Sequence, residues 1–167
     1  MVNDKKQFEN KAVLVIDDEP MMRKLLGGLL HDIGFTNVYE AEDGAEALKR
    51  LETSSDIDVV LCDLEMPIIG GLEFVGMLRS SKAALNPQVP VLIVTGHGLQ
   101  KNVRDAVNLG IHGFLVKPVS RKALEDRIVR ALKSSAIDPD VLTRKKEAAV
   151  AATSVISTPK VYEHKKK

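Results

Sequence analysis

The sequence is poor in the residues that support disulfide-stabilised or aromatic-rich cores. Of its 167 residues only Cys62 is a cysteine, tryptophan is absent, and aromatic residues make up 4%. A single cysteine excludes an internal disulfide framework and is typical of a reducing compartment. With so few aromatic residues the core must be built from Leu, Val, Ile and Ala. The hydrophobic fraction of 44% is sufficient for such a core.

The chain also lacks a strong net charge and a long apolar segment. Its formal net charge is +1, which argues against a general affinity for nucleic acid or a membrane surface. No stretch approaches the roughly eighteen apolar residues of a membrane span. Residues 1–10 form a polar arm without the apolar centre of a signal peptide. We therefore expect a cytoplasmic protein without membrane insertion, in which Cys62 is a small buried side chain rather than a reactive thiol.

Strand and helix patterns alternate over residues 11–134, with short connections between them. This alternation predicts parallel βαβ units and therefore an α/β fold with a doubly wound sheet. Pro20 is expected to begin the first helix and Gly34 to end it, and Ser120 is expected to cap the last one. The predicted strands are residues 12–16, 37–41, 57–63, 91–94 and 113–116, and the predicted helices are residues 20–33, 45–51, 71–78, 102–109 and a segment after Ser120. Leu25 is one of the apolar residues at helical spacing in the first helix, and Ala45 is expected to point inward from the second.

The composition changes after Ser134, where the predicted domain of residues 11–134 ends. The extension over residues 135–167 is too short to build an independent core. We expect it to be partly helical, over about residues 138–150, or disordered. Its three final residues, Lys165 to Lys167, are interpreted as a solvated tail. The alternative is a basic patch that docks on acidic partners or nucleic acid.

Polar residues follow four of the predicted strands. Asp17 and Asp18 come after the first strand, Asp63 ends the third, Thr95 follows the fourth and Lys117 follows the fifth. The carboxyl ends of parallel strands lie at one edge of a sheet, where ligands bind. Each residue has an ordinary explanation by itself, such as a turn, a local hydrogen bond or a surface charge. Their shared position favours a functional site.

The residue types at this edge suit phosphoryl transfer. Three close carboxylates repel one another unless a proton or a cation neutralises them. Mg²⁺ binds one or two carboxylates and completes its shell with water and phosphate oxygens. Asp63 stands alone after its strand and is the candidate nucleophile, forming an acyl phosphate, while Asp17 and Asp18 would hold the metal. Thr95 and Lys117 could bind phosphoryl oxygens.

Four segments lie at the ends of predicted strands: Val15-Ile16-Asp17-Asp18-Glu19-Pro20, Asp63-Leu64-Glu65-Met66-Pro67 with Gly71 beyond it, Val94-Thr95-Gly96, and Phe114-Leu115-Val116-Lys117-Pro118. Through these segments the chain resembles the receiver domain of bacterial two-component response regulators, of the single-domain, chemotaxis-regulator type. The resemblance covers residues 11–134. It implies a flavodoxin-like sheet of five parallel strands, ordered 2-1-3-4-5 and flanked by five helices, the order of flavodoxin and of chemotaxis regulators.

The resemblance implies that Asp63 accepts a phosphoryl group from a sensor histidine kinase or a phosphotransfer protein. It also implies a Mg²⁺ ion, which Mn²⁺ could replace. The metal ligands would be Asp17, Asp18, Asp63 and the backbone carbonyl of Glu65. Beyond its own phosphorylation and dephosphorylation the protein would not be an enzyme.

In this family the bound phosphoryl group also switches the conformation. By resemblance, Thr95 and Lys117 bind its oxygens, and Thr95 and Phe114 are the switch residues. Glu65 and His97 occupy the positions that tune phosphoryl lifetime. The output would be the binding of a downstream protein at the face of the fourth helix, fifth strand and fifth helix. The chain would act as a monomer or as a phosphorylation-dependent dimer.

Three alternatives remain open at the level of sequence. The chain could be a receiver-like binding module without phosphate cycling, or a regulator whose C-terminal tail is the effector element. It could also be a small phosphohydrolase of the aspartyl-phosphate type. Such enzymes usually carry a second aspartate where this chain has Glu65, and the chain has little room for their cap. His31, His112 and His164 lack metal-like spacing and are interpreted as structural or exposed.

Overall fold

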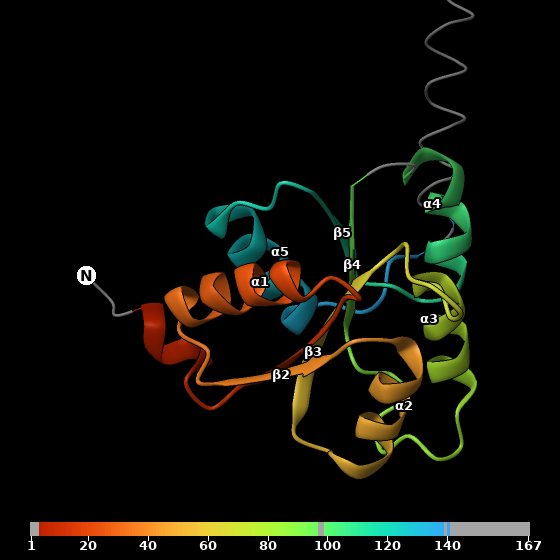
Figure 1. Cartoon of the computed structure of the whole chain (residues 1–167), viewed down its shortest axis with the longest axis horizontal. Coiled ribbons are helices and arrows are strands. Elements are labelled where there is room, and N and C mark those ends of the chain that lie inside the picture. Colours follow the sequence, from red (N-terminus) through yellow and green to blue (C-terminus); the bar gives the residue numbers. More distant parts are fainter. Residues whose placement is uncertain (1–3, 97–98, 139, 141–167) are drawn as a thin grey trace, which may run out of the picture. The chain divides into compact units, whose positions relative to one another are not determined.

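The computed structural model describes residues 4–96, 99–138 and 140 (Figure 1). The chain divides into two compact units, Met1–Ile137 and Asp138–Lys167, and only Asp138 and Asp140 of the second are described. The helix predicted over residues 138–150 therefore falls almost wholly outside the described residues.

The strands are β1 (Ala12–Ile16), β2 (Asn37–Ala41), β3 (Ile57–Asp63), β4 (Val91–Thr95) and β5 (Gly113–Val116). The helices are η1 (Asp4–Phe8, a 3-10 helix), α1 (Pro20–Ile33), α2 (Gly44–Thr53), α3 (Gly71–Ser80), α4 (Leu99–Asn108) and α5 (Arg121–Lys133).

Within the described residues the five strands form one parallel sheet in the order β2-β1-β3-β4-β5, which confirms the predicted order. Strands β1 and β4 are buried along their whole length, and β3 is buried except at Asp58. This burial explains their near-continuous apolar sequences, because helices cover both faces of a parallel sheet. The edge strands β2 and β5 are partly exposed.

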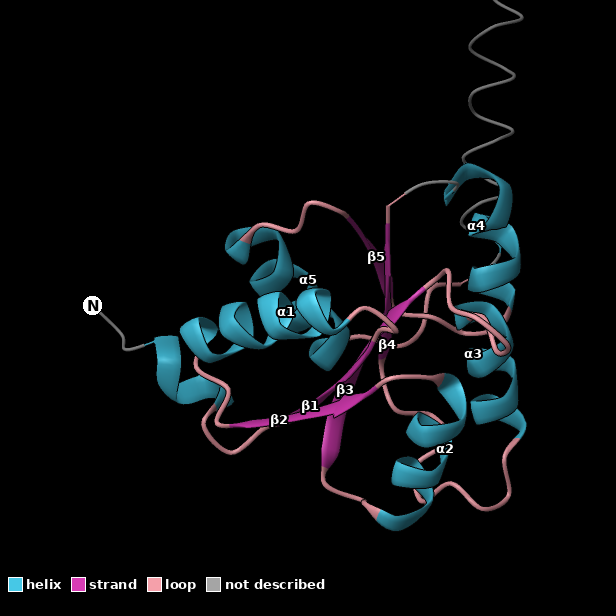
Figure 2. Ribbon diagram, in the orientation of Figure 1, coloured by secondary structure: helices cyan, strands magenta, loops and turns pink. Residues whose placement is uncertain are grey.

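Helices cover the two faces of the sheet unequally (Figure 2). Helices α1 and α5 lie on one face, and α2, α3 and α4 lie on the other. Alternate residues of the central strands point into the core beneath α1 and α5, as the twofold periodicity of a strand requires. The buried members of this core are Phe8, Val13, Val15, Leu26, Leu30, Ile33, Phe35, Val59, Leu61, Leu92, Val94, Leu115, Leu124, Ile128 and Ala131.

The N-terminal helix η1 contributes an apolar contact that the sequence analysis did not predict. Phe8 is only 2% exposed, and its ring stacks on Phe35 with the centroids 4.8 Å apart. The chain approaches closely because Gly34, with φ of 126°, has no side chain. A Cβ there would lie 2.5 Å from the carbonyl oxygen of Lys5. Residues that look like a polar arm in the sequence therefore include part of the core.

The helix signals read from the sequence are largely confirmed. Helix α1 begins at Pro20 and ends before Gly34, whose N–H bonds to the last carbonyls of the helix. Ser120 caps α5 by accepting a hydrogen bond from the N–H of Ala123 at 3.2 Å. Each of these residues acts on its near neighbours in the chain, which makes the signal local.

Four helical details differ from the prediction. Helix α2 begins one residue early, because Asp43 caps it by accepting a hydrogen bond from the N–H of Glu46. Ala45, expected to point inward, is exposed in this first turn. Leu25 belongs to the apolar pattern of α1 but is 52% exposed. Helix α4 begins at Leu99, three residues before the predicted start.

In the described part of the chain, every helix is too short or too polar to span a bilayer.

Candidate functional site

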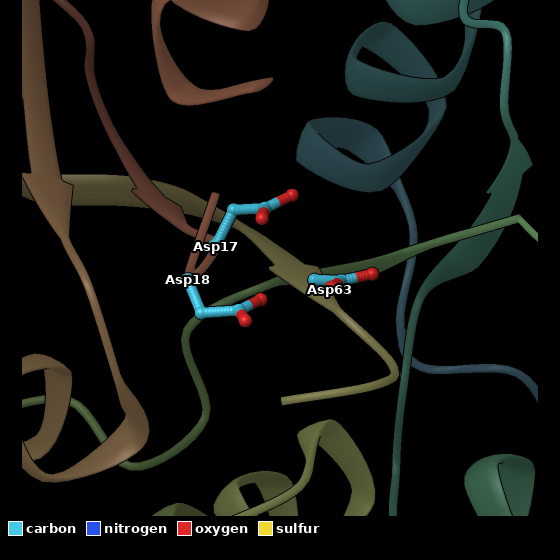
Figure 3. Close-up of side chains that lie close together, drawn as sticks. All are labelled: Asp17, Asp18 and Asp63. Atoms are coloured by element: carbon cyan, nitrogen blue, oxygen red, sulfur yellow. The ribbon is translucent and has the colours of Figure 1, made fainter. Parts of the chain in front are cut away.

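Three aspartates meet at the carboxyl edge of the two neighbouring strands β1 and β3 (Figure 3). Ile16 pairs with Cys62 across these strands, so the next residues, Asp17 and Asp63, lie side by side. One carboxylate oxygen each from Asp17, Asp18 and Asp63 lies within 4.8 Å of the others. The three carboxylates extend to the same side of the strand ends.

The three carboxylates differ in exposure. Asp17 is 1% exposed and Asp63 is 7% exposed, whereas Asp18 is exposed. The backbone N–H of Glu19 donates a hydrogen bond to Oδ1 of Asp17 at 2.9 Å. Asp17 is thus fixed below the surface, and Asp18 reaches the site from the solvent side.

Lys117 reaches this cluster from β5. Its Nζ lies 3.3 Å from Oδ2 of Asp17 and 3.3 Å from Oδ1 of Asp63, so one ammonium group joins both buried carboxylates. The backbone N–H of Lys117 donates to the carbonyl of Thr95 at 2.8 Å. This bond ties the end of β5 to the end of β4, where Thr95 is buried.

Burial and like charge shape the electrostatics of the site. Burial raises the pKa of Asp63, and the carboxylates of Asp17 and Asp18 raise it further against the opposing effect of Lys117. For Lys117, burial acts to lower the pKa, but attraction to Asp63 and Asp17 outweighs it and the pKa is raised. Among the described residues, three carboxylates thus lie near one ammonium group, which contacts two of them. The remaining negative charge and the oxygen donors fit a small divalent cation such as Mg²⁺.

The raised pKa of Asp63 predicts a pH-dependent stability. The folded chain keeps a proton on Asp63 at pH values where the unfolded chain, near the ordinary value of 3.8, has lost it. Folded-state stability therefore declines as pH rises from 3.8 through the raised pKa. We expect metal-free Asp63→Asn to unfold at a higher temperature than wild type near neutral pH, with the difference shrinking below that window.

Thermal unfolding with a chelator, followed across this pH range, measures the effect. Asp126→Asn is the matched control, because Asp126 is 53% exposed and pairs with Lys122 on the surface of α5. It should show no comparable difference. An Asp63→Asn protein that is less stable than wild type at neutral pH would contradict the charge repulsion inferred for this site.

The loop after Asp63 turns sharply into α3. The N–H of Gly71 donates to the carbonyl of Leu64 at 2.9 Å, and a Cβ at Gly71 would overlap the carbonyl oxygen of Asp63. Ile68, in the same loop, has φ of 70° and is 97% exposed. Only a glycine at position 71 allows the helix to begin this close to the candidate nucleophile. Glu65 is also in this loop, with an exposed side chain.

The structure brings Asp17, Asp18, Asp63 and Lys117 together, and it places Thr95 at the end of the adjoining strand. Phe114 is half-buried in β5, opposite Ile93 of β4. His97 lies outside the described residues.

Cys62 and the described histidines have structural surroundings. Burial raises the pKa of the Cys62 thiol, and its Sγ–H donates to the carbonyl of Asp63 at 3.3 Å. Nδ1 of His112 accepts a hydrogen bond from the N–H of Val91, and Nδ1 of His31 bonds to the carbonyl of Phe35. His164 lies outside the described residues.

One residue that contacts the site was not predicted from the sequence. Arg23 of α1 donates a hydrogen bond from Nη1 to the backbone carbonyl of Asp17 at 2.6 Å. A signal was present, because a basic residue near the N-terminus of a helix opposes the helix dipole and needs a compensating partner. Its partner could not be named from the sequence, since the acceptor is a backbone oxygen.

Comparison with known proteins identifies the family. Residues 13–129 match the response regulator receiver domain. Chemotaxis protein CheY-3 of Vibrio cholerae is 32% identical over 120 residues, which cover 72% of this chain and 90% of that protein. A response regulator receiver domain protein from Clostridium thermocellum has a similar structure, with a TM-score of 0.67 and 31% identity over 74% of this chain and 94% of that one.

A third similar structure is the receiver domain of the histidine kinase CKI1 from Arabidopsis thaliana, complexed with Mg²⁺ and BeF₃⁻. Its TM-score is 0.69, with 26% identity over 78% of this chain and 95% of that one. The chain therefore belongs to the response regulator receiver domain family. Proteins of this family act in two-component signalling. They are generally phosphorylated by a kinase, and they typically bind Mg²⁺ in the acidic site.

Proposed function

We propose that this chain is a single-domain response regulator whose Asp63 accepts a phosphoryl group from a phosphohistidine. The donor would be a sensor histidine kinase or a phosphotransfer protein. The observation that carries the proposal is the meeting of Asp17, Asp18 and Asp63 within 4.8 Å, with Lys117 3.3 Å from two of them. A surface pair of acidic residues would not be buried in this way or share one ammonium group.

In the proposed reaction a carboxylate oxygen of Asp63 attacks the phosphorus of the phosphohistidine. The new O–P bond forms as the P–N bond breaks, and the imidazole leaves with the electron pair and takes up a proton. Lys117 opposes the rise in the pKa of Asp63 and offers its charge to the transferred oxygens. Positioning and charge neutralisation supply most of the catalysis in such transfers.

The proposed metal ligands are the side chains of Asp17, Asp18 and Asp63 and the backbone carbonyl of Glu65. Bound Mg²⁺ would supply positive charge against the phosphoryl oxygens. Mn²⁺ could take its place, because it also prefers oxygen ligands in octahedral geometry. Asp17 and Asp18 would hold the ion, leaving one oxygen of Asp63 for the attack.

The proposed switch connects the site to a binding surface. Bonds from the phosphoryl group to Thr95 and Lys117 would favour one arrangement of the ends of β4 and β5, and Phe114 would change rotamer with it. A downstream protein would then bind the face formed by α4, β5 and α5. Glu65 and His97 would set the lifetime of the phosphoryl group.

The proposal is tested by incubating the full chain with acetyl phosphate and Mg²⁺ and measuring the mass of the intact protein. We expect one added phosphoryl group per chain. When a chelator is added before the donor, we expect no phosphoryl group to be added. A chain that takes up no phosphoryl group from acetyl phosphate or from any of a panel of histidine kinases would be a binding module instead. Turnover of small phosphate esters would indicate a phosphohydrolase.

Removal of Asp18 is expected to weaken Mg²⁺ binding. Asp18→Ala deletes the exposed carboxylate of the three while leaving the buried pair with Lys117 in place. We expect an affinity lower by at least about tenfold, equivalent to about 1.4 kcal/mol. Calorimetric titration with Mg²⁺ measures it, with the exposed Asp126→Ala as the control. An unchanged titration would reject Asp18 as a ligand.

A further inference from the structure

Arg23 joins two strands at the edge of the sheet that carries the acidic site. Its Nη1 donates to the carbonyl oxygen of Asp17, after β1, at 2.6 Å. Its Nε lies 3.4 Å from Oε2 of Glu40, on β2. The Arg23 side chain is only 14% exposed, so the guanidinium is held between these partners rather than solvated.

The hydrogen bond is the stronger of the two links. Glu40 is 50% exposed, and an ion pair open to solvent on one side contributes little. A charged donor on a backbone carbonyl makes a stronger bond than a neutral one. Glu40 thus mainly sets the direction of the guanidinium.

The local sequence of α1 leaves room for this arrangement. Gly27 follows Arg23 by one turn and lies on the same face of the helix. An ideal Cβ at Gly27 would lie 3.9 Å from Oε1 of Glu40, so a side chain longer than alanine would take the place of the carboxylate. An alanine would make only an ordinary van der Waals contact at this distance, so the arrangement excludes longer side chains but does not require glycine.

We propose that Arg23 is a positioning residue for the metal-binding aspartates. By holding the carbonyl of Asp17, it fixes the turn between β1 and α1. This turn determines the spacing of the Asp17 and Asp18 carboxylates from Asp63. The inference rests on the proposed function, because it takes Mg²⁺ as the ligand of that site.

Charge and position predict opposite effects when Arg23 is replaced. The positive charge of Arg23 by itself repels a divalent cation nearby, so removing only the charge would tighten Mg²⁺ binding. Removing an anchor of the Asp17 turn would loosen the ligand geometry and weaken binding. The sign of the change therefore separates the two roles.

The test is calorimetric titration of the full chain with Mg²⁺, without a phosphodonor. We expect Arg23→Gln to bind about tenfold more weakly than wild type, the scale seen when a group that orients metal ligands is lost. Affinity equal to or greater than wild type overturns the proposal.

Should Arg23→Gln fail to fold, Arg23→Lys replaces it, because it keeps the charge but cannot reproduce the planar two-partner geometry. Weaker binding by Arg23→Lys supports the proposal, and wild-type affinity overturns it.

Arg79 provides a matched control at the opposite edge of the sheet. Its part-buried guanidinium donates to the carbonyls of Pro87, Val89 and Gly110, which precede β4 and β5. Arg79→Gln should lower the unfolding temperature at least as much as Arg23→Gln while leaving the Mg²⁺ titration unchanged. An equal loss of Mg²⁺ affinity in Arg79→Gln would show a general effect of instability and overturn the proposal.

The outcome for wild type separates this inference from the proposed function. Wild-type protein that binds no Mg²⁺ contradicts both. Wild-type protein that binds Mg²⁺ and accepts the phosphoryl group, together with Arg23→Gln of unchanged affinity, contradicts the positioning role alone.

Discussion

Asp63→Asn is expected to abolish phosphorylation of the chain by acetyl phosphate, lowering the rate at least about a thousandfold. An amide has no carboxylate oxygen to attack phosphorus, so the acyl phosphate cannot form. The substitution is nearly isosteric and removes a charge that is repelled by Asp17 and disfavoured by burial. The fold should therefore survive, and the loss should be one of chemistry alone.

Mass measurement of the intact protein, with and without the phosphodonor, reports this result directly. Asp58→Asn is the matched control, because Asp58 lies on the same strand, β3, away from the acidic cluster. There it accepts a hydrogen bond from the N–H of Ala12 at 2.8 Å and pairs with Lys11. The control should retain phosphorylation. Uptake by Asp63→Asn at the wild-type rate would identify a different nucleophile.

The second large effect concerns stability. Phe8→Ala should lower the free energy of unfolding by about 3–5 kcal/mol, the usual cost of removing a buried phenylalanine. Phe8 is 2% exposed, stacks on Phe35 and belongs to the core beneath α1 and α5. Since single domains are stable by about 5–15 kcal/mol, this is a large share of the total.

Urea unfolding measures the loss, with Leu25→Ala as a control on α1. Leu25 is 52% exposed, so its truncation should change the free energy of unfolding by no more than about 0.5 kcal/mol. A Phe8→Ala protein within 1 kcal/mol of wild type, on the order of a surface substitution, would show that η1 does not pack on the domain.

Much of the site could be predicted because it obeys a rule of parallel sheets. Apolar runs identify the strands, and the polar residue after each run lies at the common carboxyl edge. Asp17 and Asp63 are 46 residues apart, yet the pairing of Ile16 with Cys62 puts them side by side. No knowledge of side-chain packing is needed for this step.

Other contacts could not be predicted, because their partners are distant in sequence or are backbone atoms. Phe8 is a single apolar residue in a polar segment, and its burial depends on Phe35 and on the space left at Gly34. Arg23 binds a carbonyl oxygen, which every residue possesses and no sequence motif marks. Ala45 fits the helical pattern, but it lies in the first turn of α2, away from the sheet side.

The sequence by itself determined the order of strands and helices and the identity of the acidic, hydroxyl and ammonium groups at the strand ends. Periodicity and turn residues are local properties, so they can be read one segment at a time. Only the tertiary structure decided that Lys117 lies 3.3 Å from both Asp17 and Asp63, that Phe8 completes the core, and that Arg23 anchors the Asp17 turn. These contacts depend on how whole elements pack together, and packing fixes distances that no single segment contains.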